Sequence, residues 1–272
     1  MEPTTKDLAS IVSLVLDRTG IDLRHGKREL IISRLQKRVR AGGFASYAAY
    51  LDAVEDDPTG DELALLIDSL TTNHTSFFRE PQHFDLVRTR VLPELLAVHR
   101  RPVEVWSAAC SSGEECFTLA MTLRDTLPAE LADRSRILGT DISNKVLRVA
   151  RQGIYPMERV RGLPIELLRR HFERGLGSSA GQVRVQEALR SMVRFEHLNL
   201  LEIGDLGARF DFIFCRNVMI YFDLATQTRV VANLERHLAP RGYLFVSHAE
   251  SLTNVPTQLS RVAPAVYQRQ AA

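Results

Sequence analysis

The stretch V-E-V-W-S-A-A-C-S-S-G-E-E-C-F-T-L-A-M, residues 103–121, decides the fold. The apolar run 103–108 predicts a buried strand, the small residues after it predict a turn, and the remainder predicts a helix. Backbone N–H groups at the start of such a helix point toward the carboxyl end of the strand, where open parallel sheets bind their ligands. The stretch therefore predicts an α/β protein with a ligand site at this turn.

The turn holds a single glycine, Gly113, so it fits neither the G-x-G-x-x-G fingerprint nor the phosphate-binding loop. This composition argues against NAD and ATP, because both need the backbone to approach a pyrophosphate closely. Ser112 and Glu115 also have the spacing of a capping box. Glu115 is therefore predicted both as a helix cap and as a ligand contact.

A second strand is predicted at R-I-L-G-T-D-I-S, residues 136–143, and it ends in Asp141. A carboxylate after the second strand of a βαβ unit can accept hydrogen bonds from two ribose hydroxyls. The alternative is that Asp141 is only the N-cap of a helix that starts near Ser143. Together with the first turn, Asp141 indicates a cofactor that contains a nucleoside.

The hydrophobic pattern divides the chain into three parts. Apolar residues recur at helical spacing over 5–70, which predicts a helical N-terminal domain (residues 1–75). A linking helix broken at Pro93 is expected over 76–102. From 103 to 272, strands at 103–108, 136–141, 193–198, 210–215 and 242–247 alternate with helices, which predicts a doubly wound, largely parallel sheet. Glycines 175, 177 and 181 around V-R-V predict an antiparallel β-subdomain inserted at about 154–192, either for recognition or as a solvated excursion.

Composition sets the class of protein. With 45% hydrophobic and 25% charged residues and a net charge of +2, the chain is an ordinary globular protein whose overall charge demands no nucleic acid. Its three cysteines, Cys110, Cys116 and Cys215, form no metal-type pair and predict reduced thiols in a cytoplasmic protein. The apolar run 11–16 is too short for a membrane span and too acidic in its surroundings for a signal peptide.

Residues 24–40 carry seven Lys and Arg residues against one Glu. Helical spacing places Lys27, Arg34, Lys37 and Arg38 opposite an apolar stripe, so a helix with a cationic face is expected between Lys27 and Arg40. Such a face steers acidic partners, although it can also be merely solvated. RNA is a further alternative, but no aromatic residues interleave to stack bases.

Two more strings carry polar groups. T-T-N-H-T-S-F-F-R-E, residues 71–80, offers hydrogen-bonding side chains and the charged Arg79, whereas C-R-N-V-M-I-Y-F, residues 215–222, places Asn217 at the end of an apolar strand. The Asn/Asp-Pro-Pro-aromatic string expected of nucleic-acid amino-methyltransferases is absent from the second string. His74 and His248 are interpreted as packing or hydrogen-bonding residues.

Six motifs in order, T-T-N-H-T-S-F-F-R-E, V-W-S-A-A-C-S-S-G-E-E, G-T-D-I-S, H-L-N-L-L-E, F-C-R-N-V-M-I-Y-F-D and G-Y-L-F-V-S-H-A-E-S-L, closely resemble the bacterial chemotaxis protein methyltransferases, the CheR family. The resemblance covers nearly the whole chain, up to Ser251. It implies a Rossmann-like doubly wound S-adenosylmethionine methyltransferase sheet with a small all-helical N-terminal domain and an inserted small antiparallel β-subdomain. It also implies methyl transfer from S-adenosylmethionine to glutamate side chains of chemoreceptors, giving methyl esters and S-adenosylhomocysteine.

Carried over by position, the resemblance implies a set of cofactor contacts: Asn73, Thr75, Arg79, Glu115, Asp141, Asn199, Leu200, Asn217 and Val218. Arg79, Arg216 and Tyr221 are candidates to hold the substrate carboxylate. No general base is expected, since glutamate is already ionised at neutral pH, and no metal site is predicted. Cys110 and Cys116 stand where the family often has a small residue and a proline, which makes Cys110 a candidate for oxidation.

The resemblance also implies partners. Acidic methylation helices of chemoreceptors are expected to dock on the basic helix between Lys27 and Arg40, and a receptor C-terminal peptide on the β-subdomain. We expect a cytoplasmic monomer that neither binds nucleic acid nor inserts into membranes. The alternatives are a methyltransferase for RNA or a small molecule, and a non-catalytic regulator that binds the cofactor.

Overall fold

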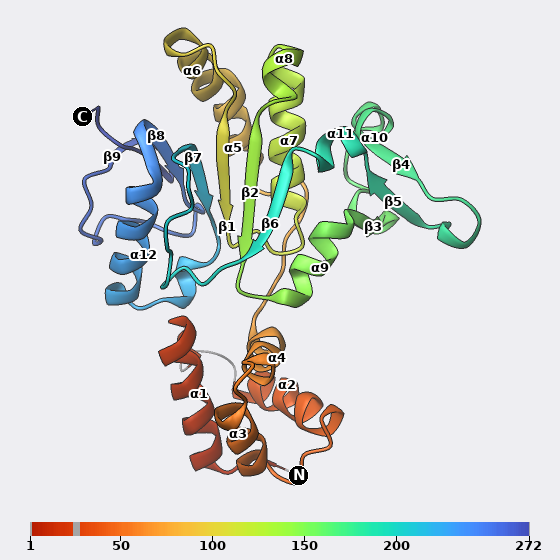
Figure 1. Cartoon of the computed structure of the whole chain (residues 1–272), viewed down its shortest axis with the longest axis vertical. Helices are drawn as coiled ribbons and strands as arrows, with labels where there is room; N and C mark the ends of the chain where they lie inside the picture. The colour runs from red at the N-terminus through yellow and green to blue at the C-terminus, as the bar shows by residue number, and fades with distance from the viewer. Residues whose placement is uncertain (1, 24–27, 272) are drawn as a thin grey trace.

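The computed structural model describes residues 2–23 and 28–271, and its first helices form a domain of their own (Figure 1). This helical domain consists of α1 (Thr5–Thr19), α2 (Arg28–Ala41), α3 (Tyr47–Asp56) and α4 (Asp61–Leu70). Ile11, Leu35, Tyr50 and Leu66 are fully buried in its core. One side chain comes from each helix, so the helical spacing read from the sequence corresponds to a packed interior.

A seven-stranded sheet forms the centre of the rest of the chain, with the strand order β6-β2-β1-β7-β8-β10-β9. The strands are β1 (Glu104–Ala108), β2 (Arg136–Asp141), β6 (Val193–His197), β7 (Phe210–Cys215), β8 (Leu238–Phe245), β9 (Ser260–Ala263) and β10 (Val266–Gln268). The strands β1, β2, β6, β7 and β8 are parallel, as predicted. The strands β10 and β9 add an antiparallel edge that was not predicted. The chain moves outward from β1 first through β2 and then through β7, so the direction of winding reverses beside β1.

Each central strand contributes to a hydrophobic core on both faces of the sheet. In β7, Phe212 and Phe214 face one core, whereas Ile213 and Cys215 face the other. This alternation is the two-residue period of a strand buried on both sides. α7 (Glu114–Thr126), α8 (Ala129–Ala132) and α9 (Asn144–Gln152) belong to the first face, and α12 (Leu224–His237) covers the second (Figure 1). In the described part of the chain, no helix is long and apolar enough to cross a membrane.

Residues 81–98, in the segment between the helical domain and β1, are helical without a break. They run through α5 (Pro81–Leu86), the π-helical turn η1 (Val87–Val91) and α6 (Leu92–Val98). The break expected at Pro93 is therefore wrong. The N–H of Leu92 donates to the carbonyl of Val87, one residue further back than in an α-helix, and this wider turn directly precedes the proline that cannot donate.

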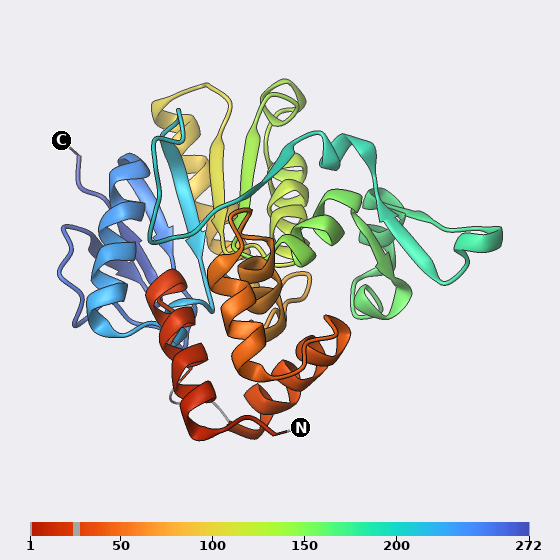
Figure 2. The same ribbon diagram turned by 60° about the horizontal axis from the view of Figure 1, so that its bottom comes forward.

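The predicted β-subdomain is present as a separate three-stranded antiparallel sheet in the order β3-β5-β4. Its elements are β3 (Ile154–Pro156), η2 (Met157–Arg159), α10 (Ile165–His171), β4 (Phe172–Arg174), η3 (Gly177–Ser179), β5 (Gln182–Val185) and α11 (Glu187–Arg190). Figures 1 and 2 show the small sheet projecting to one side of the large one. Val183 and Val185 are buried while Gln182 and Arg184 are exposed, so β5 turns alternate residues inward.

His83 on α5 is buried against the large sheet. Its ring lies edge-on to Phe214 and Phe245, and its Nδ1 is 3.1 Å from Nη1 of Arg216. Burial, and secondarily the charge of Arg216, lowers the pKa of His83 to about 4 from 6.5. The folded protein therefore keeps this imidazole neutral at pH values where the unfolded chain protonates it.

This pKa difference predicts that stability falls as the pH drops from 7 to 5, because the unfolded chain then binds more protons than the folded one. The wild type should lose about 2 kcal/mol more of its free energy of unfolding over this range than His83→Gln, whose amide does not titrate. Urea unfolding followed by circular dichroism at both pH values measures the difference. An equal loss in both proteins would show that His83 does not titrate in this way.

Candidate active site

A cavity of about 340 Å³ is lined by residues of the helical domain and by residues at the carboxyl ends of the parallel strands. It is lined by every residue predicted to contact the cofactor: Asn73, Thr75, Arg79, Glu115, Asp141, Asn199, Leu200, Asn217 and Val218. Arg216 and Tyr221, the other candidates for the substrate carboxylate, line it as well. The structure thus gathers residues from five of the six sequence motifs at one place, while their roles in binding remain predictions.

The turn after β1 has an unusual backbone. Ala109, Ser111 and Gly113 all have positive φ, at 66°, 51° and 93°. A Cβ on Gly113 would lie 2.9 Å from the Cβ of Ala150, so this position requires glycine for space as well as for conformation. Strained loops of this kind occur where a site needs a fixed backbone shape.

The capping box predicted at this turn is wrong. Gly113 is the N-cap of α7 and makes no side-chain cap bond, while the hydroxyl of Ser112 donates to the carboxylate of Glu114. Glu115 instead accepts hydrogen bonds from Ser107 Oγ and Arg216 Nε, both at 2.8 Å. Of the two predicted roles for Glu115, the helix cap is wrong, whereas the ligand contact stays a prediction for a residue that lines the cavity.

Asp141 ends β2 and fixes the shape of the same turn. Its carboxylate accepts from the backbone N–H of Ser111 at 2.8 Å and of Ser143 at 2.9 Å. Burial raises the pKa of Asp141, although these two N–H groups act to lower it. The N-cap of α9 is Ser143, whose side chain accepts from Val146, so the alternative that Asp141 caps this helix is also wrong.

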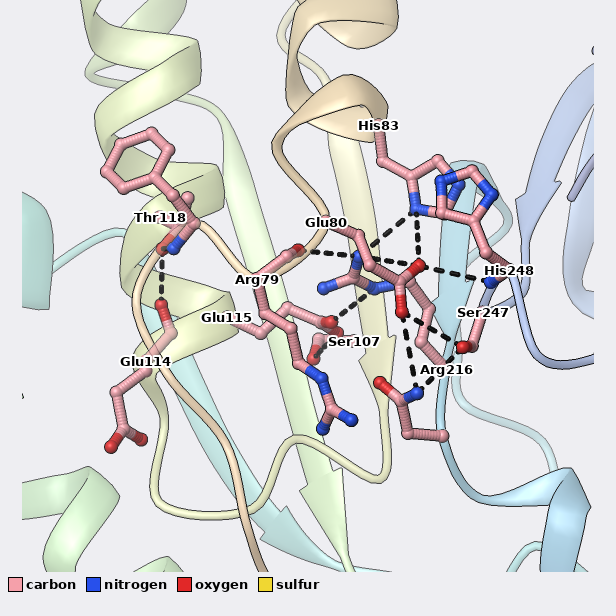
Figure 3. Close-up of polar contacts among 12 residues, drawn as sticks. Arg79, Glu80, His83, Ser107, Glu114, Glu115, Thr118, Arg216, Ser247 and His248 are labelled. Carbon is pink, nitrogen blue, oxygen red and sulfur yellow. Dashed lines mark hydrogen bonds and ion pairs between the residues drawn. The ribbon is translucent and has the colours of Figure 1, made fainter. Parts of the chain in front are cut away.

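Arg216, at the end of β7, forms a buried ion pair with Glu115 (Figure 3). Its guanidinium lies over the rings of Phe84 and Phe214, and its side chain is 2% exposed. Nη1 donates to the carbonyl of Arg79 at 2.8 Å. These contacts tie Arg216 to protein groups and favour a structural part for it over contact with a substrate.

Glu80 and Glu250 hold the neighbouring loops. The Glu80 carboxylate accepts from Ser247 Oγ at 2.9 Å and lies 3.6 Å from Arg216. Burial acts to raise the pKa of Glu80, but the charge of Arg216 and the hydrogen bonds outweigh it, and this pKa is lowered. Glu250 accepts from the backbone N–H groups of Ser247, Asn217, Met219 and Ile220.

Neither glutamate was predicted as a site residue. Both lie within the quoted motifs. For Glu250 the signal available was a carboxylate in the loop after a predicted strand, whereas for Glu80 it was only its place beside Arg79 in the motif. Glu80, His83 and His248 also lie close enough together to hold a metal ion, with their ligand atoms within 4.8 Å of one another. The guanidinium of Arg216, 3.1 Å from His83 Nδ1, already supplies a positive charge there.

The segment 71–80 crosses from the helical domain to the sheet and forms another wall of the cavity. Nη1 of Arg79 donates to the carbonyl of His74 at 2.9 Å, and Figure 3 shows this guanidinium turned away from that of Arg216. The carbonyl of Asn73 accepts from Ser111 Oγ at 3.0 Å. The segment is thus joined to the turn after β1 while Arg79 remains half-buried beside the cavity.

Asn199 has both ends of its side chain engaged. Nδ2 donates to the carbonyl of Arg18 at 2.8 Å, and Oδ1 accepts from the N–H of Leu201 at 3.1 Å. These bonds join the C-terminal end of α1 to the loop after β6. They make a side-chain contact between Asn199 and the cofactor less favourable than the resemblance implies, although the residue still lines the cavity.

The cationic face predicted on α2 is narrower than expected. Arg34 turns inward and donates to the carbonyl of Leu70 and to Thr72 Oγ1, and Arg38 pairs with Glu62. Lys37 is exposed, whereas Lys27 lies outside the described residues. Two of the four predicted cations are thus occupied by partners within the helical domain.

The donor set fits a ligand that joins a nucleoside to an amino acid. Asp141 can accept from ribose hydroxyls, Glu115 can face an ammonium group, and Arg79 can pair with a carboxylate. Ile142, Leu200 and Val218 supply apolar surface in the same cavity. The volume of about 340 Å³ lies at the lower end of the range for small-molecule sites.

Comparison with known proteins identifies both halves of the chain. Residues 73–267 match the family described as "CheR methyltransferase, SAM binding domain", and residues 6–71 match "CheR methyltransferase, all-alpha domain". The chain is 39% identical to chemotaxis protein methyltransferase 2 of Pseudomonas aeruginosa, over 97% of this chain and 93% of that protein. It is 40% identical to the chemotaxis protein methyltransferase of Escherichia coli, over 94% and 88%. The protein of Borreliella burgdorferi with the same name is 36% identical, over 98% and 95%.

These matches extend over the helical domain, the cavity and the β-subdomain, and they agree with the donor set of the cavity. The cofactor is S-adenosylmethionine, and the reaction is a methyl transfer in chemotaxis. The chain therefore belongs to the CheR family of S-adenosylmethionine-dependent chemotaxis protein methyltransferases.

Proposed function

We propose that this enzyme transfers the methyl group of S-adenosylmethionine to glutamate side-chain carboxylates of chemoreceptors, forming glutamate methyl esters. The observation that carries the proposal is the match to chemotaxis protein methyltransferases over both the helical and the cofactor-binding parts of the chain. Such a match is expected where the substrate as well as the cofactor is shared.

The reaction requires the protein mainly to position its two reactants. A glutamate at neutral pH is already a carboxylate and needs no general base. S-adenosylmethionine supplies a methyl group on a good leaving group, so the enzyme has to align the two and exclude water. Arg79 and Tyr221 can orient a carboxylate at the cavity, while Arg216 positions Glu115 and the backbone of Arg79.

Two surfaces are proposed for the receptor. On α2, Lys37 and Arg40 are exposed on one face and can meet an acidic helix. In the β-subdomain, β4 lies at an edge of the small sheet, where an extended peptide can add as a further strand. A peptide held there would raise the local concentration of the methylation helices around the enzyme. We propose that the enzyme acts as a monomer in the cytoplasm.

The direct test is transfer of tritiated methyl from S-adenosylmethionine to membranes that contain chemoreceptors. We expect label that alkali releases as methanol, because a carboxylate ester is base-labile. Alkali-stable label would contradict the ester. Label that enters RNA but not receptors would favour the alternative substrate class, and binding of the cofactor without any transfer would favour a non-catalytic regulator.

Asp141→Asn should weaken S-adenosylmethionine binding about tenfold, because a neutral amide is a poorer acceptor for ribose hydroxyls than a carboxylate. Isothermal titration calorimetry measures the dissociation constant, and a thermal melt without cofactor verifies folding. Asp68→Asn is the matched control, since Asp68 accepts from the N–H of Lys145 and does not line the cavity. Equal binding by both variants would exclude the ribose contact.

Tyr221→Phe should lower kcat about tenfold while leaving the dissociation constant of S-adenosylmethionine unchanged, because only the hydroxyl proposed to orient the substrate is lost. Methyl transfer to receptor membranes gives kcat, and calorimetry gives the cofactor affinity. The control is Tyr47→Phe in α3, away from the cavity. A normal kcat for Tyr221→Phe would remove Tyr221 from the candidates.

A further inference from the structure

We infer that Arg159, which belongs to the inserted β-subdomain, is a positioning residue of the S-adenosylmethionine site. Arg159 ends the short η2 helix that follows β3. Its Nη1 donates to the carbonyl of Thr75 at 3.1 Å and to Oε1 of Glu114 at 3.2 Å. Thr75 belongs to the segment that forms one wall of the cavity, and Glu114 precedes Glu115 in another, so this one guanidinium joins two walls.

The contact with Glu114 matters most, because this carboxylate is buried. Its side chain is 1% exposed, whereas that of Arg159 is 45% exposed. Its carboxylate also accepts a hydrogen bond from the hydroxyl of Ser112 at 2.7 Å, and among the described residues Glu114 forms an ion pair with no other cation. Figure 3 shows this carboxylate directed away from the Glu115–Arg216 pair.

The unequal burial decides what loss of Arg159 would do. A half-exposed ion pair contributes little to stability by itself. Removing its exposed member, however, leaves a buried carboxylate without a counter-charge, and such a group is strongly disfavoured. Glu114 opens α7, so any movement that brings its carboxylate to water also moves the adjoining Glu115 and the turn before Gly113.

Further contacts between the β-subdomain and the same two walls support this inference. The hydroxyl of Tyr155 in β3 donates to the carbonyl of Ser112 at 2.7 Å. The ring of Phe77 lies edge-on to Tyr155 at 5.2 Å and to Phe172 in β4 at 5.3 Å. The β-subdomain thus packs on the turn after β1 and on the segment 71–80, and Arg159 adds the charged contact.

The inference concerns cofactor binding and does not depend on which substrate is methylated. It gives the β-subdomain a part in forming the cofactor pocket, whether or not a receptor peptide binds to its edge. Failure of receptor methylation and failure of this inference are therefore distinguishable, because S-adenosylhomocysteine binding can be measured with the full-length enzyme alone.

The test is a double-mutant cycle in full-length enzyme, with S-adenosylhomocysteine affinity measured by calorimetry. Arg159→Gln should weaken binding about tenfold, because glutamine can still donate to Thr75 but cannot neutralise Glu114. Glu114→Gln alone should bind within about threefold of wild type, and adding it to Arg159→Gln should restore that affinity, since no buried charge then remains. A purely structural effect of Arg159 would leave the two changes additive.

Arg161→Gln is the matched control, because Arg161 is an exposed arginine two residues further along the same loop. It should bind as the wild type does. Arg159→Lys, which keeps the charge, should lie closer to wild type than Arg159→Gln and guards against a folding defect. Wild-type affinity for Arg159→Gln, or the absence of rescue by Glu114→Gln, would overturn the inference.

Discussion

The buried ion pair between Glu115 and Arg216 is the interaction on which the rest of the site depends. It joins the first turn of α7 to the end of β7, a helix and a strand that are far apart in sequence. Two charges removed from water are tolerated only when further bonds satisfy them. Ser107 supplies one such bond to Glu115, and the carbonyl of Arg79 accepts another from Arg216. The pair therefore also fixes the position of the Arg79 backbone, from which this side chain extends.

Buried carboxylates also set the shape of the loops around the cavity. Asp141 holds the turn after β1 through Ser111, and Glu250 holds the loop after β7 through Asn217. Both Ser111 and Asn217 have positive φ without being glycine. Such backbone conformations persist only where the surroundings over-determine them. Asp141 at the end of β2 and Glu250 in the loop after β8 supply that constraint.

Most of the fold could be predicted from the sequence because strands buried on both faces are continuous apolar runs. The edge strands β9 and β10 escaped prediction since they are short and only partly apolar. The motifs predicted which residues line the cavity, but they did not predict the hydrogen-bond and ion-pair partners of those residues. Ser112 and Glu115 have the spacing of a capping box, yet Arg216, 101 residues away, takes up the glutamate. Arg34 has the spacing of a solvent-facing residue but meets the carbonyl of Leu70, 36 residues further on. Local periodicity contains no information about such distant partners.

The position of the cavity between two domains has a thermodynamic consequence. Ile21 packs against the core of the helical domain and against that of the sheet, and the N–H of Asp22 donates to the carbonyl of Tyr221. A cofactor held in this cavity touches residues of both domains, so its binding free energy also opposes their separation. We therefore expect S-adenosylmethionine to act as part of the interface, so that the domain contact tightens as the concentration of the methyl donor rises.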